Sequence, residues 1–122
     1  MKIQNARRIL ICGSRHYTDK GVMRDWFERF HEETVIIHGA CKGADLLAQD
    51  LAIEFELDYL GFPARWTKEG KAAGPIRNQR MIRLGRPDYV LAFHKNIAKS
   101  KGTSNMVSQA RKLGITTNVV IE

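Results

Sequence analysis

Residues 8–15 read Arg-Ile-Leu-Ile-Cys-Gly-Ser-Arg, a short apolar run that ends in a glycine, a serine and an arginine. Four consecutive apolar residues leave no polar face, which is typical of a strand buried on both sides in the middle of a parallel sheet. The loop 13–15 then follows the carboxyl end of this strand. We therefore predict a central strand at 8–12, with a loop at the edge where parallel sheets bind ligands.

Short apolar runs alternate with helical patterns along the rest of the chain. We predict further strands at 34–38, 58–62, 88–93 and 116–121, helices at about 19–32, 44–56, 75–84 and 103–113, and a long surface loop at 64–74. Such alternation indicates βα units around a parallel sheet. The prediction is one α/β domain over residues 1–122. It is a Rossmann-like three-layer sandwich with five parallel strands in the order 3-2-1-4-5, the third strand being an edge.

Charge and composition limit the classes of partner and the location that we expect for this protein. The net charge of +7 favours anionic partners, nucleotides or nucleic acid, although the scattered basic residues also fit a merely solvated surface. No stretch approaches the roughly 18 apolar residues of a membrane span, so we predict no membrane contact and a cytoplasmic location. Cys12 and Cys41 suggest neither a disulfide framework nor a metal site, and no metal is predicted. The oligomeric state stays open, with a homo-oligomer as one alternative.

Four loops near the predicted ligand crevice carry residues suited to phosphate. Glycine lets the backbone approach a ligand, hydroxyls and the free N–H groups of helix N-termini donate to phosphate, and arginine pairs with it. The predicted ligand-binding residues are Gly13, Ser14 and Arg15 in the first loop, Gly39, Lys42, Gly43 and Asp45 in the second, Arg77 and Asn78 in the third, and Lys101, Gly102 and Thr103 in the fourth.

Several of these residues also have a purely structural interpretation. Asp45 can stabilise the N-terminus of its helix, and Thr103 can be an N-cap. Residues 39–45 do not form a Walker A loop, because Ala44-Asp45 stands where Lys-Ser/Thr is required. Arg77 is predicted in the first turn of its helix, where a cation opposes the macrodipole and suggests a bound anion. We expect its removal to weaken ligand binding and to spare the fold.

Three ring-bearing side chains are further candidates. His38 ends the predicted strand 34–38, and His94 comes at the end of the predicted strand 88–93. Each histidine either faces the crevice or is a hydrogen-bonded structural residue. Trp66 either stacks on a base or anchors its loop. If the protein is an enzyme, the candidate catalytic residues are Asp45 and His38.

Four motifs together resemble the SLOG superfamily of Rossmann-like proteins, and in particular its small single-domain bacterial and phage branch. They are Gly13-Ser14-Arg15, His38-Gly39-x-x-Lys42-Gly43-Ala44-Asp45, Gly74-Pro75-x-Arg77-Asn78-x-x-Met81 and Ser100-Lys101-Gly102-Thr103. The resemblance covers nearly the whole chain and implies a nucleotide-derived ligand, with NAD- or ADP-ribose-related molecules among the alternatives. The first hypothesis is therefore a domain that binds or senses such a ligand through the four loops.

A related family, the LONELY GUY phosphoribohydrolases, implies an enzymatic alternative. These enzymes cleave nucleoside monophosphates at the N-glycosidic bond and carry an Arg-Lys-x-x-Met segment and a Gly-Thr-x-x-Glu loop. The matching residues here are Arg77 and Met81 of the segment and Gly102 and Thr103 of the loop. Asn78 replaces the lysine, and Met106 replaces the catalytic glutamate. Hydrolysis or transfer at an N-glycosidic or phosphoester bond would then need Asp45 or a histidine in its place.

A second relative, DNA-processing protein A, implies a third hypothesis. It has a similar Gly-x-x-x-Gly-x-Asp loop and binds single-stranded DNA. The match rests on Gly39, Gly43 and Asp45, and the positive charge of the chain agrees with it. In this hypothesis Trp66 stacks on bases while the basic loops follow the nucleic-acid backbone.

Overall fold

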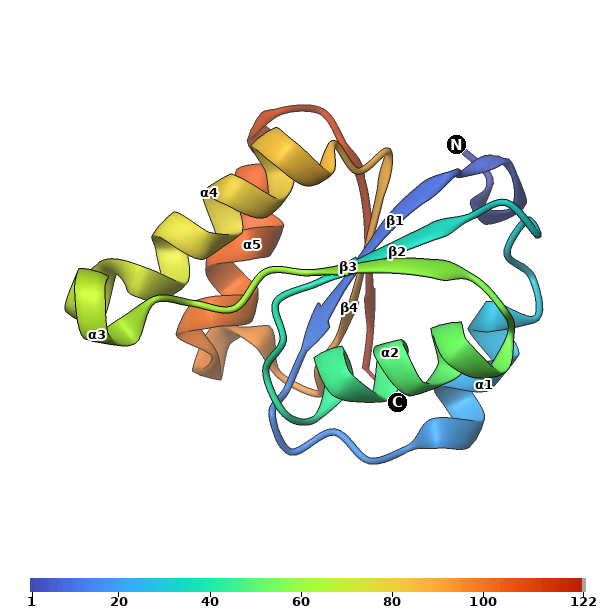
Figure 1. Ribbon diagram of the computed structural model, residues 1–122, viewed down its shortest axis with the longest axis horizontal. Coiled ribbons are helices and arrows are strands. Elements are labelled where there is room, and N and C mark those ends of the chain that lie inside the picture. The colour runs from blue at the N-terminus through green and yellow to red at the C-terminus, as the bar shows by residue number, and fades with distance from the viewer. Residues whose placement is uncertain (122) are drawn as a thin grey trace.

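A five-stranded parallel sheet forms the middle layer of the computed structural model, which describes residues 1–121 (Figure 1). Its strands are β1 (Arg8–Gly13), β2 (Val35–His38), β3 (Asp58–Gly61), β4 (Tyr89–Phe93) and β5 (Thr116–Val120). The order β3-β2-β1-β4-β5 confirms the prediction, and β3 is an edge strand. Leu10 pairs with Ile37 of β2 and with Val90 of β4. The carboxyl ends of β1 and β4 therefore meet at the switch point of the fold, where open α/β sheets bind ligands.

Helices cover both faces of this sheet, which confirms the three-layer arrangement (Figure 1). The α-helices are α1 (Lys20–Phe27), α2 (Ala44–Glu54), α3 (Trp66–Glu69), α4 (Ala73–Gly85) and α5 (Lys101–Lys112), and the 3₁₀ helices are η1 (Ile3–Asn5), η2 (Gly70–Ala72) and η3 (Ile97–Lys99). α1 and α2 pack on one face of the sheet, and α4 and α5 pack on the other. None of the helices in residues 1–121 is long and apolar enough to cross a membrane.

β1 contributes side chains to both cores, which explains its continuous apolar run. Ile9 and Ile11 are fully buried with α1 and α2, whereas Leu10 and Cys12 are buried with α4 and α5. Successive residues of a strand point to opposite faces, so a strand covered on both sides needs apolar residues at every position. Burial also raises the pKa of the Cys12 thiol far above its ordinary value, so this cysteine packs as a small neutral side chain.

Two segments differ from the prediction because local turns form where longer elements were expected. α1 ends at Phe27 instead of near residue 32, since the chain tightens there and Phe30 donates its N–H to the carbonyl of Phe27. The predicted surface loop at 64–74 is wrong, because this segment contains α3, η2 and the start of α4. Helices this short show little sequence periodicity, which is why the pattern did not reveal them.

The starts of α4 and α5 also lie earlier than predicted. α4 begins at Ala73, so Pro75 is its third residue instead of its first. A proline fits there because the first N–H groups of a helix have no intrahelical acceptor. α5 begins at Lys101, because the Ser100 hydroxyl accepts a hydrogen bond from the Thr103 N–H at 3.2 Å. Ser100 is therefore the N-cap, and Thr103 lies inside the first turn.

The close approach at Gly13 gives a stability prediction. A Cβ on Gly13 would lie 2.9 Å from Ala44 Cβ and closer still to the carbonyl oxygen of Phe93. Overpacking of this kind costs roughly 1 to 3 kcal/mol, so we expect Gly13→Ala to lower the free energy of unfolding by about that amount. The matched control is Gly102→Ala, because a Cβ on this helical glycine would meet no atom within 4 Å. It should raise stability by up to about 1 kcal/mol in urea denaturation, and equal effects of both changes would contradict the packing argument.

Candidate functional site

The β1–α1 loop packs directly on the β2–α2 loop at the carboxyl edge of the sheet. The carbonyl of Ser14 accepts a hydrogen bond from the N–H of Ala44 at 3.0 Å, and the N–H of Ser14 donates to Phe93 of β4 at 3.0 Å. Gly43, the residue before α2, has a φ of 85°, and a Cβ there would lie 2.6 Å from Arg15 Cα. The first two predicted loops are thus brought together, and only a glycine fits at their junction.

Asp45 closes the β2–α2 loop from within. Its Oδ2 accepts hydrogen bonds from the N–H groups of Gly39 at 3.0 Å and Cys41 at 3.3 Å, and the side chain is buried. Burial raises the pKa of the carboxyl to about 6, while the bond from Cys41, the charge of Arg77 and the bond from Gly39 oppose the rise. These contacts give Asp45 a structural role, because it accepts hydrogen bonds from the backbone of its own loop.

Arg77 holds the same loop from α4. Its Nη1 donates to the carbonyl of Gly39 at 2.6 Å and approaches Cys41 Sγ at 3.5 Å, and its Nε donates to Asn78 Oδ1 at 2.9 Å. The residue is only 7% exposed and lies in the second turn of α4, because that helix begins at Ala73. The expected place in the first turn is therefore wrong, and the argument from the helix dipole no longer applies. Contact between Arg77 and a ligand phosphate stays a prediction.

Asn78 connects α4 to the start of α5. Its Nδ2 donates to the carbonyl of Gly102 and to Asn105 Oδ1, both at 3.1 Å, while its Oδ1 accepts from Arg77. An amide both donates and accepts, whereas a lysine at this position could only donate. Asn78 can therefore make all the hydrogen bonds of this network, whereas the lysine that phosphoribohydrolases carry at this position could not accept the one from Arg77. Sequence reasoning missed Asn105, whose position one turn beyond Gly102 gave no separate signal.

Three cations of the candidate set differ from Arg77 in that their side chains are exposed. They are Arg15, Lys42 and Lys101. The backbone of Arg15 touches Gly43, the residue after Lys42, whereas Lys101 begins α5 on the other side of the Asn78 network. No ion pair within residues 1–121 involves any of the three. Their charges are therefore available to a ligand at this edge.

His38 and His94 both make hydrogen bonds within the protein. His38 is almost fully buried; its Nδ1 accepts from the Ala40 N–H at 3.0 Å, and its Nε2 lies 2.9 Å from Gln49 Oε1. Burial lowers the pKa of His38, so the neutral ring is favoured. His94 Nδ1 accepts from the N–H of Asn96 at 2.9 Å. These contacts fit the structural interpretation of both histidines.

Met106 and Trp66 lie in opposite environments. Met106, at the position of the phosphoribohydrolase glutamate, is completely buried in the apolar core between α5 and the sheet. A carboxylate would be costly there without a partner. Trp66 begins α3 and is 58% exposed, with its ring close to Gly74. It can therefore both contact α4 and offer a ring face to solvent.

Comparison with known proteins identifies two sequence relationships. The sequence model of the YspA, cpYpsA-related SLOG family matches residues 7–68, which include the first two loops of the site. The Gene 61 protein of Mycobacterium phage D29 is 34% identical over 118 residues, covering 89% of this chain and 92% of that protein. The second match extends the relationship to α4 and α5, because so little of the chain lies outside it.

A solved structure with a similar fold is that of DNA processing protein A from Streptococcus pneumoniae. The superposition has a TM-score of 0.51 at 14% sequence identity and covers 98% of this chain. This chain corresponds to 60% of the length of that protein. At this identity the likeness concerns the fold alone.

The buried carboxyl of Asp45 predicts a dependence of stability on pH. Its pKa rises from 3.8 to about 6 on folding, so the folded state favours the protonated acid. That stabilisation is complete below about pH 4 and is lost as the pH rises through about 6. At 1.4 kcal/mol per pKa unit, the unfolding free energy should fall by roughly 3 kcal/mol over this window. Urea denaturation of the natural protein and of Asp45→Asn tests this, since parallel pH profiles would contradict it.

The contacts of Arg77 predict that its substitution destabilises the fold, which the sequence did not suggest. Arg77→Ala removes the donors to the Gly39 carbonyl and to Asn78 Oδ1, so we expect the free energy of unfolding to fall by roughly 2 to 4 kcal/mol. Arg83→Ala, an exposed arginine of the same helix, is the matched control and should stay within about 0.5 kcal/mol. Unchanged stability of Arg77→Ala would return Arg77 to the ligand-binding role expected from the sequence.

Proposed function

This chain belongs to the YspA, cpYpsA-related SLOG family, and we propose that it binds or senses a phosphate-bearing, nucleotide-derived ligand. The proposed site is the carboxyl edge of β1, β2 and β4, with the N-termini of α2 and α5 beside it. Helix N-termini carry partial positive charge, which favours phosphate, although the N–H groups of Ala44 and Thr103 are already hydrogen-bonded within the protein. NAD, ADP-ribose and nucleoside monophosphates are the ligands to test first.

One observation carries this proposal, namely the exposed pair Arg15 and Lys42 beside the Gly43 junction. The backbone of Arg15 contacts Gly43, and neither cation belongs to an ion pair within the described residues. A phosphate bound between these two unpaired cations, at the start of a helix, would gain a charge-assisted hydrogen bond from each.

Binding is favoured over hydrolysis at this site because the candidate catalytic groups have other partners. Asp45 accepts two backbone hydrogen bonds, and both ring nitrogens of His38 are engaged. Met106 is apolar and buried where the phosphoribohydrolases carry their glutamate. A general acid or base must reach the reacting atoms, and none of these three side chains is free to do so in the observed arrangement.

A second candidate function, binding of single-stranded nucleic acid, is favoured by the surface around α3. Trp66 is largely exposed, and the nearby Arg65, Lys68 and Lys71 are exposed cations. Aromatic side chains among cations bind single strands by stacking on bases while the charges neutralise phosphates. This surface lies outside the four loops, so the two functions depend on different residues.

Ligand titration of matched variants tests the proposal. If a nucleotide phosphate contacts Arg15 and Lys42, each alanine substitution removes a charge-assisted hydrogen bond and weakens affinity by roughly 10-fold or more. Lys112→Ala, an exposed lysine at the other end of α5, is the control and should bind normally. The measurement is calorimetry, with the apo melting temperature recorded for each variant, using NAD, ADP-ribose and adenosine monophosphate.

An oligothymidylate titration included in the same experiment separates the two candidate functions. Binding that falls steeply with salt and is lost in Trp66→Ala, while Arg15→Ala and Lys42→Ala bind normally, would favour the nucleic-acid function. If no nucleotide binds, or if Lys112→Ala loses as much affinity as Arg15→Ala and Lys42→Ala, the proposed site is wrong.

A further inference from the structure

The outer edge of β3 is the most open part of the sheet. All four residues of the strand are exposed, and Tyr59 and Leu60 expose 40% and 41% of their surface. β3 crosses the front of the molecule in Figure 1, with α2 and α4 on its two sides. An exposed strand edge that carries apolar side chains is a template for pairing with another strand.

The backbone of β3 leaves only a short segment available for such pairing. The N–H of Phe62 donates to His38 of β2 at 2.8 Å, and because backbone groups alternate along a strand, those of Tyr59 and Gly61 point outward. The N–H of Leu57 donates to Ala52, and Pro63 has no N–H. The open segment is therefore limited to residues 58–62.

We propose that this edge pairs with the same edge of a second copy of the chain, antiparallel about a two-fold axis. The axis passes between Leu60 and the partner's Leu60. Tyr59 then faces the partner's Gly61, and the two residues exchange backbone hydrogen bonds on each side of the axis. A register centred on Tyr59 would need the N–H of Leu57, and one centred on Gly61 would need Pro63. The register centred on Leu60 avoids both.

Side chains support this register on both faces of the sheet. On the α2 face, each Gly61 leaves room for the partner's Tyr59, since Gly61 has no side chain to meet the ring. On the α4 face, Leu60 contacts the partner's Leu60. The exposed Leu84 of α4 stands close by, on the wall of a groove that starts at Gly61. The apolar surface that β3 exposes is thereby covered.

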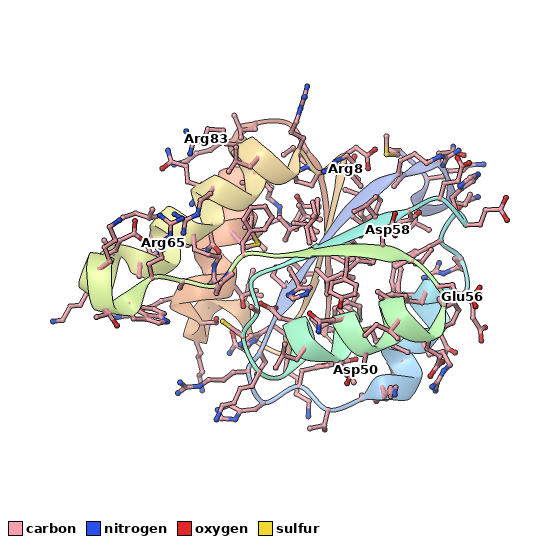
Figure 2. The ribbon with its side chains drawn as sticks, viewed as in Figure 1. Arg8, Asp50, Glu56, Asp58, Arg65 and Arg83 are labelled. Carbon is pink, nitrogen blue, oxygen red and sulfur yellow. The ribbon has the colours of Figure 1, made fainter. Side chains whose placement is uncertain are left out.

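Charge complementarity favours a second copy over other partners. Figure 2 shows Asp58 and Glu56 near the start of β3 and Arg65 beyond its end. Antiparallel pairing brings Asp58 opposite the partner's Phe62, at a groove of about 310 Å³ that Arg65 and Arg80 also line. The Arg80 Nη2 is buried without a hydrogen bond in residues 1–121, and its ion pair with Glu69 is long, at 3.9 Å. In the dimer, the partner's Asp58 would lie at a groove lined by two basic side chains, Arg65 and Arg80, once in each half.

The oligomeric state of the full chain tests the proposal. Sedimentation velocity over a concentration series should give twice the 13.9 kDa of the chain. Leu60→Lys places two lysines across the axis and should weaken the dimer at least about tenfold, whereas Leu113→Lys, at an exposed position after α5, should not. Circular dichroism melting confirms that both variants are folded. A protein that is monomeric at every concentration, or a dimer that Leu60→Lys leaves intact, would overturn the proposal.

A charge-swap experiment tests the antiparallel register. In a homodimer of either variant, Asp58→Arg or Arg65→Asp, positions 58 and 65 of the two copies carry like charges. Each variant should therefore dimerise at least about tenfold more weakly than the natural protein. Mixed in equal amounts, they restore opposite charges at both ends of the interface and should form a heterodimer. Failure of the mixture to recover association would overturn the register.

Discussion

The backbone of Gly39 is held on both sides, and the shape of the candidate site depends on it. Its N–H donates to Asp45 Oδ2 at 3.0 Å, and its carbonyl accepts from Arg77 Nη1 at 2.6 Å. A Cβ on Gly39 would lie 2.5 Å from that Arg77 atom and 3.0 Å from the Asp45 oxygen, so any side chain there would displace the guanidinium and the carboxylate from their present positions. The loop between β2 and α2 is therefore fixed by an acid on one helix and a base on another, from opposite layers of the sandwich.

This arrangement places two buried charges where neither is directly paired with the other. Asp45 and Arg77 both bind the backbone of Gly39, and the raised pKa of Asp45 indicates that burial outweighs the hydrogen bonds and the arginine charge. The neutral acid is thus accessible not far below neutral pH. The geometry of the loop is linked to the protonation of one residue, because the acid loses acceptor strength when it binds a proton.

The fold could be read from the sequence because it depends on periodicity, whereas the contacts within the site depend on long-range geometry. The run at 8–12 required a central strand, and the alternation of elements then left few strand orders. The four motifs identified loops that do meet. The partners of Arg77 could not be foreseen, because Gly39 lies 38 residues away and in a different layer. The misplaced start of α4 had a local cause, since Gly74-Pro75 looked like a helix start but lies inside the first turn.

Arginine at position 77 and arginine at position 15 show why residue type alone does not assign a role at such a site. Both were expected to bind phosphate, but Arg77 uses its fork of donors on a carbonyl, an amide oxygen and a sulfur, while Arg15 is exposed and unpaired within the described residues. A buried guanidinium that leaves its acceptors would leave them unsatisfied, whereas an exposed one gives up only water. Recruiting Arg77 to a ligand therefore costs more free energy than recruiting Arg15. In the proposed site, recruiting Arg15 and Lys42 to a ligand would likewise cost less free energy than recruiting Arg77, whose hydrogen bonds hold the β2–α2 loop.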